Sequence, residues 1–310
     1  MIVEAQGLVK RYGSLTALDH LDLSIEEGEV FGLLGPNGSG KTTAINCILS
    51  LLKYDEGSVK LFDQPMSPDA YALKRDIGVV MQNVAVFDEL TVQDNIDYFC
   101  GLYIGDRAER KRLVDEAIEF VGLNDFRKFY PKKLSGGLLR RLNIACGIAH
   151  KPRLILLDEP TVAVDPQSRN KILEGIKQLN AQGATVLYTS HYMEEVELIC
   201  SRIMIIDKGK IVAQGTKEQL KEMIMLGEKI TVEATGLTEA FLQSLLDQSQ
   251  VLSAVCENDV LTVRLERGHN GLLDLLDQVK QTGAVIGRVY SELPTLNDVF
   301  LELTGKELRD

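Results

Sequence analysis

The sequence predicts an α/β protein with a smaller α+β unit behind it, and three observations support this prediction. Short apolar strands alternate with helices over roughly the first 225 residues, as in a parallel sheet covered by helices. A glycine-rich loop at 35–42 falls between an expected strand and an expected helix. After residue 227 the strand and helix pattern starts again. Because a length of 310 residues suits about two domains, we expect one at 1–225 and another at 228–310.

The expected elements of the first domain follow one another along the chain. Residues 88–133 show helical patterns at 91–103 and 107–123 without a strong strand pattern, so we expect a helical subdomain at about 88–150, inserted between two strands of the sheet. Strands are expected at 29–35, 76–82, 153–158, 184–190, 202–207 and 210–215, and further helices at 41–52, 136–150, 167–182 and 192–200.

The second domain has its own order of elements. Strands and helices follow as β, α, β, β, α, β, which fits a small ferredoxin-like unit, and a last helix closes the chain. The strands are expected at 229–234, 250–257, 259–266 and 284–291, and the helices at 238–248, 270–283 and 295–305.

Composition limits the classes of partner. The formal net charge is −11, and residues 228–310 carry 14 acidic against 7 basic side chains, which argues against nucleic acid as a partner. The five cysteines are dispersed without CxxC spacing, which favours buried thiols over disulfides or a zinc site. No apolar run approaches the ~18 residues of a membrane span and the start lacks a signal peptide, so we expect a cytoplasmic protein.

The stretch "GPNGSGKT" matches the phosphate-loop pattern G-x-x-x-x-G-K-[ST] in the required strand-to-helix context. Its glycines allow a tight loop whose N–H groups surround phosphate oxygens. Lys41 supplies a point charge to the phosphates, Thr42 offers a hydroxyl to Mg²⁺, and Thr43 is a further donor. The predicted phosphate-binding residues are Gly35, Pro36, Asn37, Gly38, Ser39, Gly40, Lys41, Thr42 and Thr43.

A buried strand followed by two carboxylates supplies a second part of the site. In "LILLDEP" (154–160), Asp158 ends the strand and can hold Mg²⁺ directly or through water. Glu159 points elsewhere and could orient or deprotonate a water molecule. Two adjacent carboxylates at the end of a buried strand are costly without a nearby cation, which favours this interpretation over a plain polar turn.

A second anion site is expected at "LSGGLLRRLN" (134–143). Ser135 is placed as an N-cap, Gly136 and Gly137 allow close backbone approach, and a helical run follows. Free N–H groups and the helix dipole favour an anion there. Arg140 and Arg141 are interpreted as part of an ordinary basic helix face.

Residues 1–225 resemble the ATP-binding subunit of ABC transporters, because several motifs of that family occur in its order. They are the phosphate loop, Gln82 in "VVMQN", "LSGG" at 134–137, "LILLDEP", "TVAVD" at 161–165 and His191 in "TSHYMEE".

The resemblance implies a P-loop NTPase core that binds and hydrolyses ATP with Mg²⁺. It also implies a homodimer in which two domains stack head to tail. Each ATP would then lie between one phosphate loop and the other subunit's LSGG, so that Ser135, Gly136 and Gly137 meet the γ-phosphate of the partner's ATP. A γ-phosphate that is present or absent would decide whether the two subunits adhere.

The resemblance also assigns roles to single residues. Tyr12 resembles the aromatic residue on which adenine stacks, and Asp165 the residue that crosses the dimer interface. Gln82 resembles the contact to Mg²⁺ and the attacking water, Glu159 the catalytic base and His191 the residue that contacts the γ-phosphate.

The chain departs from the family pattern in two places. Leu138 stands where the family often has Gln, which puts the interface detail there in doubt, although the phosphate contacts expected from Ser135 and the backbone should survive. Ala163-Val164 replaces the common Gly-Leu, and weaker consequences are expected because Asp165 keeps its place.

A membrane permease subunit is the partner that the resemblance implies, with this chain on the inner face of the cell membrane. The apolar residues of "NVAVFDELTV" (83–92) suit a groove for the partner's cytoplasmic helix, or alternatively pack on their own sheet. "SHYMEEVE" and "LNDVFLELTG" resemble the bacterial drug and antibiotic exporters, which suggests a peptide antibiotic, a drug or a lipid-like compound as cargo. An importer ATPase, a soluble non-transport ABC ATPase and a regulatory module that binds ATP without hydrolysis are the alternatives.

Overall fold

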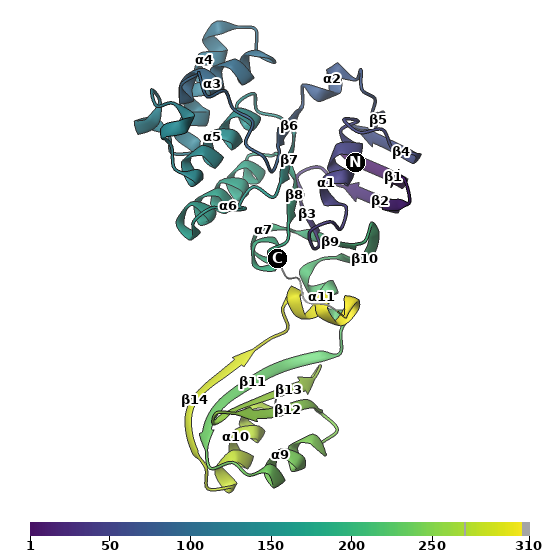
Figure 1. The fold of residues 1–310 in the computed structure, drawn as a ribbon, viewed down its shortest axis with the longest axis vertical. Coiled ribbons are helices and arrows are strands. Elements are labelled where there is room, and N and C mark those ends of the chain that lie inside the picture. The colour runs from purple at the N-terminus through teal and green to yellow at the C-terminus, as the bar shows by residue number, and fades with distance from the viewer. Residues whose placement is uncertain (270, 306–310) are drawn as a thin grey trace. The chain divides into compact units, whose positions relative to one another are not determined.

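The computed structural model describes residues 1–269 and 271–305, and these form two compact units (Figure 1). The first unit is Met1–Thr216 and the second begins at Lys217. Asn270, with which the helix predicted at 270–283 begins, and residues 306–310, the end of the expected second domain, lie outside the described residues.

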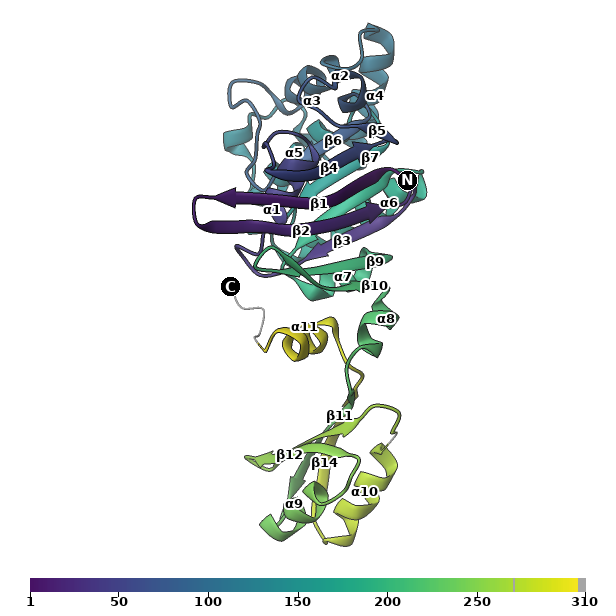
Figure 2. The ribbon, with the colours of Figure 1, turned by 90° about the vertical axis from the view of Figure 1, so that its right-hand side faces the viewer.

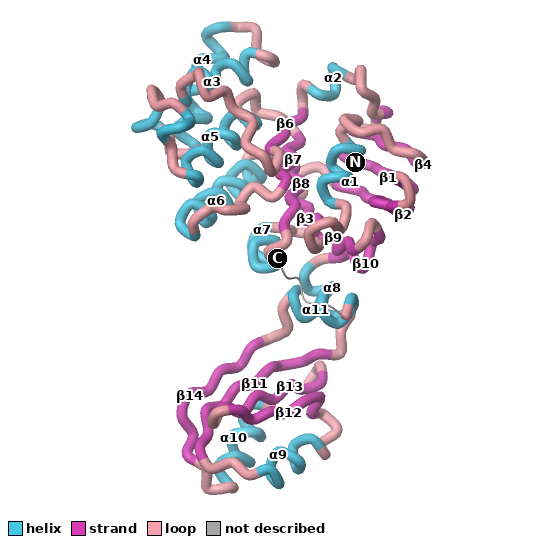
Figure 3. Tube along the Cα trace, viewed as in Figure 1, coloured by secondary structure: helices cyan, strands magenta, loops and turns pink. Residues whose placement is uncertain are grey.

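A six-stranded sheet forms the centre of the first unit, in the order β10-β9-β3-β8-β7-β6 (Figure 3). The five strands from β9 to β6 run parallel, and β10 pairs antiparallel with β9. All six strands were predicted. They are β3 (Val30–Leu34), β6 (Ile77–Val80), β7 (Leu154–Asp158), β8 (Thr185–Ser190), β9 (Arg202–Asp207) and β10 (Lys210–Gly215).

A second, antiparallel sheet of this unit, in the order β2-β1-β4-β5, was not predicted. The strands of this sheet bury only part of their side chains, so no continuous apolar run marks them. The sheet lies beside α1 and the parallel sheet (Figure 2). The three share one core, built from residues such as Leu8, Leu23, Phe31 and Ile45. Its strands are β1 (Val3–Tyr12), β2 (Leu15–Ile25), β4 (Glu56–Leu61) and β5 (Gln64–Pro65).

The helices of the first unit follow the expected order, and several of them end earlier than expected. The helix expected at 41–52 ends at Ile48, and Ser50 then adopts a left-handed φ of 51°. The unpredicted α2 is a single turn. The helices are α1 (Lys41–Ile48), α2 (Tyr71–Lys74), α3 (Val92–Gly101), α4 (Arg107–Phe120), α5 (Gly136–Ile148), α6 (Pro166–Ala181) and α7 (Met193–Ile199), with 3₁₀ turns at Asn124–Phe126 and Pro131–Lys133.

The helical subdomain joins the sheet through a loop held by one buried amide. Asn95 of α3 is fully buried. Its Oδ1 accepts from the N–H of Phe87 at 2.8 Å, and its Nδ2 donates to the carbonyls of Phe87, Leu90 and Thr91 at 3.0 to 3.1 Å. This network fixes the loop between β6 and α3 because a buried amide left without partners would be costly.

The second unit has the strand order predicted for a ferredoxin-like fold. Its antiparallel sheet runs β12-β13-β11-β14, and α9 and α10 cover one face over a core that includes Ile230, Val263 and Val279. An unpredicted helix, α8, packs on α11. The elements are α8 (Lys217–Glu222), β11 (Leu226–Thr235), α9 (Glu239–Leu246), β12 (Val251–Glu257), β13 (Val260–Glu266), α10 (Leu272–Gln281), β14 (Val285–Glu292) and α11 (Leu296–Thr304).

A buried histidine lies between the helical subdomain and the sheet. The His150 ring stacks on Tyr103 with centroids 4.1 Å apart, and its Nε2 lies 3.2 Å from the carbonyl oxygen of Ile77. Burial lowers the pKa of His150 below its ordinary value of 6.5. The folded protein therefore holds the neutral ring.

We expect this histidine to destabilise the protein in mild acid. Below pH 6.5 the unfolded chain protonates His150 while the folded protein resists, so stability falls as the pH drops through the lowered pKa of the folded state. His150→Phe keeps the stack on Tyr103 and removes the titration. Urea unfolding at pH 7.5 and 5.5 should show a smaller pH-dependent loss in this variant than in the wild type.

The matched control is His20→Gln, because His20 is exposed and contacts only its neighbour Asp19 among the partners that the structure prints for its ring. If the stability of the wild type and of His150→Phe depends equally on pH, buried His150 is not the source of the acid destabilisation.

Candidate functional site

The glycine-rich loop joins β3 to α1 and is shaped by two close approaches. A Cβ at Gly35 would lie 2.2 Å from the carbonyl oxygen of Ile206, and one at Gly40 would lie 2.6 Å from that of Ala17. Gly40 also has a φ of 111° and ends the loop as the N-cap of α1, without a side-chain cap. The first amides of α1 are therefore left to bind an anion in the loop.

Lys41 lies buried inside this loop, with only 4% of its surface exposed. Its Nζ donates to the carbonyl oxygens of Gly35 at 2.8 Å and Pro36 at 3.2 Å. The same Nζ lies 3.1 Å from Oε1 of Glu159. A buried ammonium is tolerated only with such partners, so the loop and the carboxylate together hold this charge.

Asp158 ends β7 with its carboxylate between two hydroxyls. Oδ2 accepts from Thr42 at 2.9 Å, and Oδ1 accepts from Thr189 at 2.7 Å. Thr189 pairs with Asp158 in the parallel register of β7 and β8. The predicted Mg²⁺ residues Thr42 and Asp158 are therefore adjacent.

Glu159 follows in a strained backbone conformation, with a φ of 48°. Its N–H donates to Oγ1 of Thr189 at 3.0 Å, and its carbonyl accepts from Nη2 of Arg140 at 2.9 Å. Nδ1 of His191 lies 3.2 Å from Oε2 of Glu159. The structure thus brings the predicted base and the predicted histidine into contact.

Two further predicted residues lie at exposed positions. Gln82 follows β6, the strand next to β7, and is exposed to solvent. Tyr12 ends β1 with 49% of its surface exposed, and Nζ of Lys10 lies 5.4 Å from its ring centroid. The ring of Tyr12 is therefore accessible for stacking.

The predicted second anion site forms at the N-terminus of α5. Ser135 is the N-cap, and its Oγ accepts from the N–H of Leu138 at 3.3 Å. Ser135 and Gly136 are exposed, whereas a Cβ on the buried Gly137 would lie 2.4 Å from Oγ of Ser168 in α6. Because Leu138 contributes its backbone N–H to this cap, the departure from Gln leaves the cap intact.

Asp165 caps the neighbouring helix α6 and is exposed. Its Oδ1 accepts from the N–H of Ser168 at 2.9 Å. Hydrogen bonds from the Ser168 backbone and hydroxyl hold the pKa of Asp165 below its usual value. Ala163, at the second departure from the family pattern, has a φ of 58°, a conformation that a glycine would adopt without strain.

Two residues that contribute to the site were not predicted from the sequence. Arg140 is 4% exposed and donates to the carbonyls of Met81 and Glu159, so its placement on an ordinary basic helix face was wrong. Burial lowers the pKa of Arg140. Thr189 holds both Asp158 and Glu159. The sequence offered a single signal for it, its place near the end of the strand expected at 184–190.

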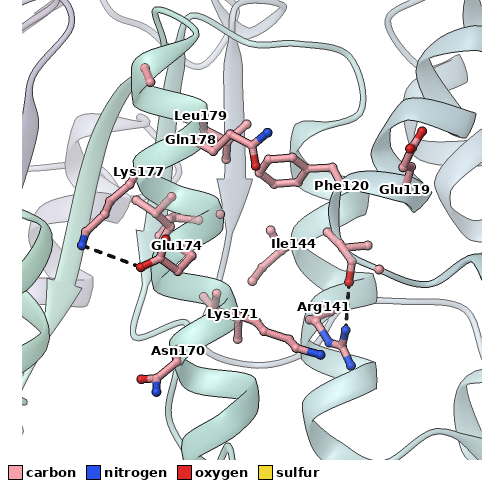
Figure 4. Close-up of a pocket in the computed structure, with 17 residues that line it drawn as sticks. Glu119, Phe120, Arg141, Ile144, Asn170, Lys171, Glu174, Lys177, Gln178 and Leu179 are labelled. Atoms are coloured by element: carbon pink, nitrogen blue, oxygen red, sulfur yellow. Dashed lines mark hydrogen bonds and ion pairs between the residues drawn. The ribbon is translucent and has the colours of Figure 1, made fainter.

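A cavity of about 810 Å³ lies away from these residues, between α4, α5 and α6 (Figure 4). Its walls include Phe120, Ile144 and Leu179, with Arg141 and Lys171 near one another. None of the predicted site residues lines it.

The site fits a nucleotide phosphate and, in part, Mg²⁺. The hydroxyl of Ser39 is buried in the loop without a hydrogen-bond partner, and such an orphaned donor suits a phosphate oxygen. Among the described residues, no group of three His, Cys, Asp or Glu side chains could hold a metal by itself. Thr42 and Asp158 offer oxygen ligands, and Mg²⁺ ordinarily completes such a set with phosphate and water.

A parallel sheet with a phosphate loop, an adjacent Asp-Glu pair and a histidine defines a P-loop nucleotide hydrolase. The family model of the ABC transporter matches residues 18–162, and the model of the "ATP-binding protein DrrA1-3-like, C-terminal domain" matches residues 215–304. The chain belongs to the ABC transporter family, as an ATP-binding subunit that carries a DrrA1-3-like C-terminal domain.

Two curated relatives match this chain over its whole length, and a solved structure matches about two thirds of it. The linearmycin resistance ATP-binding protein LnrL of Bacillus subtilis (strain 168) is 38% identical over 100% of both chains. The Nod factor export ATP-binding protein I of Ralstonia nicotianae is 36% identical over 100% of this chain and 95% of that one. A dimeric ATP-binding cassette bound to ADP and Pi after hydrolysis is 30% identical, with a TM-score of 0.64, over 69% of this chain and 98% of that one.

We expect Thr189→Val to impair ATP hydrolysis by at least ~10-fold, a factor equivalent to ~1.4 kcal/mol. The substitution keeps the shape but removes the hydroxyl that holds Asp158 and Glu159. The control is Thr185→Val at the other end of β8, where the lost hydroxyl accepts only from the N–H of Gly28.

Steady-state ATPase assays and urea unfolding of both variants separate activity from stability. Equal ATPase rates in the two variants would contradict the positioning role of Thr189.

Proposed function

We propose that this chain is the ATP-hydrolysing subunit of an ABC exporter and powers a separate membrane subunit. The observation that carries the proposal is the convergence of Lys41, Thr42, Asp158, Glu159 and His191 at the carboxyl ends of β3, β7 and β8. Open α/β sheets bind ligands at this edge.

The phosphate loop binds the phosphates of ATP in this proposal. The loop amides, the hydroxyls of Ser39 and Thr43 and the Lys41 ammonium face the β- and γ-phosphates, and Tyr12 stacks on the adenine. A phosphate offers Lys41 anionic oxygens, so it competes with the Glu159 carboxylate that lies 3.1 Å from Nζ. Nucleotide binding therefore weakens the ion pair between Lys41 and Glu159. The remaining contacts to the phosphates of ATP are proposed for Gly35, Pro36, Asn37, Gly38 and Gly40.

Mg²⁺ would be held by Thr42, Asp158 and Gln82 together with phosphate oxygens. When bound, the ion neutralises charge that develops on the phosphates. Thr189 keeps the Asp158 carboxylate oriented toward Thr42.

Glu159 serves as the base that orients and deprotonates the attacking water, and His191 contacts the γ-phosphate. The contact of 3.2 Å between Nδ1 of His191 and Oε2 of Glu159 supports a shared task. The Thr189 hydroxyl and Arg140 guanidinium hold the backbone of Glu159, so its carboxylate starts from a fixed position.

The exposed N-termini of α5 and α6 support assembly as a homodimer. Ser135, Gly136 and Gly137 would meet the γ-phosphate of the partner's ATP, while Asp165 reaches across the interface. Because the phosphate loop of each chain is complete by itself, the anion site at the N-terminus of α5 is free to bind the partner's nucleotide. The similarity to a dimeric cassette supports it.

An export role follows from the relatives, whose names refer to linearmycin resistance and Nod factor export. Within the described residues, no helix is both long and apolar enough to cross a bilayer, and the proposed partner is a membrane permease. Its docking surface is the partly exposed aromatic cluster of Phe87, Tyr98 and Phe99, whose ring centroids lie 5.0 to 5.8 Å apart. Docking there places the chain on the inner face of the cell membrane.

The two units are proposed as separate domains. Residues 1–225 form the nucleotide-binding domain, and residues 228–310 form an accessory domain. Each unit has a hydrophobic core of its own, and the two family models match them separately. The structure begins its second unit at Lys217, because α8 packs on α11.

We expect Lys41→Ala and Glu159→Gln to fail in different ways. Lys41→Ala removes the charge of the phosphate loop, so ATP affinity and the hydrolysis rate should both fall. Glu159→Gln keeps the shape of the site and removes the base, so ATP should still bind while turnover falls by at least ~100-fold. Equilibrium binding of ATP and steady-state ATPase assays measure the two effects.

Glu194→Gln, at an exposed position of α7, provides a control substitution of the same kind. A wild-type hydrolysis rate in Glu159→Gln would show that the base is another group.

A further inference from the structure

A buried carboxylate behind the proposed catalytic residues takes part in none of the steps above. Glu195, in the first turn of α7, is only 3% exposed. Its Oε2 accepts hydrogen bonds from three hydroxyls, and its Oε1 lies 3.2 Å from Nε of Arg169. The hydroxyls belong to Tyr188 at 2.6 Å, Thr161 at 2.8 Å and Ser190 at 3.0 Å. Together with Glu195 and Arg169, these three residues are called the Glu195 cluster below.

The cluster joins the segments that carry the proposed catalytic and interface residues. Its members come from the turn after β7, the end of β8, α6 and α7. In the sequence, Thr161 stands two residues after Glu159, Ser190 directly before His191, and Arg169 four residues after Asp165.

A second set of contacts leads from the same cluster to His191. The Arg169 guanidinium lies 4.8 Å from the ring centroid of Tyr192, whose ring centroid lies 4.1 Å from that of His191. The N–H of Tyr192 donates to Oγ of Ser190 at 2.9 Å. The backbone entering α7 and the ring beside His191 are therefore both held by the cluster.

A buried carboxylate is expensive to desolvate, and this one is compensated by three hydroxyl donors and a cation. Burial, and then the charge of Glu195, raise the pKa of Tyr188 well above its usual value, so its phenol remains a donor. Glu195→Gln removes the negative charge that pairs with Arg169 and leaves the three hydroxyls a weaker, neutral acceptor. The segments that they anchor then lose their fixed spacing.

We propose that Glu195 is a positioning residue for ATP hydrolysis, which sets the geometry between Glu159 and His191 by tying Thr161, Ser190 and Arg169 to one carboxylate. The inference rests on the proposed roles of Glu159 and His191. The phosphate loop lies outside the cluster, so the hydrolysis step depends on Glu195 while binding of ATP does not.

The test compares Glu195→Gln with Glu194→Gln, a control on the exposed neighbouring position of the same helix. For each variant, kcat and KM are measured with MgATP, and the Kd of ATP is measured in the Glu159→Gln background. We expect Glu195→Gln to lower kcat at least ~10-fold with a Kd within about twofold of its parent. Glu194→Gln should match the wild type.

A double-mutant cycle separates positioning from a purely structural role. Arg169→Gln and Glu195→Gln remove the two ends of one ion pair, so their effects on kcat should be less than additive. Additive effects on kcat, or a loss of ATP affinity that parallels the loss of rate, would overturn the inference.

Two milder variants test the same inference if Glu195→Gln does not fold. Tyr188→Phe and Ser190→Ala each remove one donor and leave the carboxylate paired with Arg169. Each should lower kcat several-fold without changing the Kd of ATP, and wild-type kcat in both would overturn the inference. A wild-type protein that binds ATP without hydrolysing it would instead refute the proposed function, and the positioning role would fall with it.

Discussion

The buried ammonium of Lys41 is the constraint on which the site depends. A cation in this position needs anionic or carbonyl partners, and the structure supplies two loop carbonyls and the Glu159 carboxylate. The loop can curl around the ammonium because Gly35 and Gly40 bring backbone within distances that a Cβ would forbid. The carboxylate can reach it because Glu159 turns sharply at the end of β7, with a φ of 48°.

The parallel sheet positions the residues around Glu159, the carboxylate that pairs with Lys41. The register of β7 and β8 places Asp158 beside Thr189, and that hydroxyl binds both the carboxylate of Asp158 and the N–H of Glu159. His191 follows directly after β8 and so meets Glu159 from the neighbouring strand. Together with Lys41 in the loop after β3, Glu159 after β7 and His191 after β8 therefore meet at one edge of the sheet, where the proposed ATP cleavage takes place.

Much of this arrangement could be predicted from the sequence, because short motifs carry local geometry. The phosphate loop, the Asp158-Glu159 pair and the Ser135 cap were each expected from spacing and residue type, and the strand and helix rhythm identified the parallel sheet and the ferredoxin-like unit. The antiparallel sheet was missed because its strands lie partly exposed and lack a continuous apolar run.

The long-range contacts of single side chains could not be predicted. Arg140 has the sequence context of an exposed basic helix position, and only the fold shows that its guanidinium caps the carbonyl of Glu159. Glu195 likewise stands in an acidic stretch that suits a solvated helix face, whereas the fold buries it among three hydroxyls. In both cases the partner lies on another element, beyond the reach of any local pattern.

If ATP is bound between two copies of this chain, the Glu159→Gln protein should dimerise when ATP is present, which sedimentation measures. Without the base, ATP stays intact and its γ-phosphate should hold the two phosphate loops against the two Ser135 helices. We expect a dimer with saturating ATP and a monomer with ADP. A strict monomer with saturating ATP, with or without the membrane partner, would contradict it.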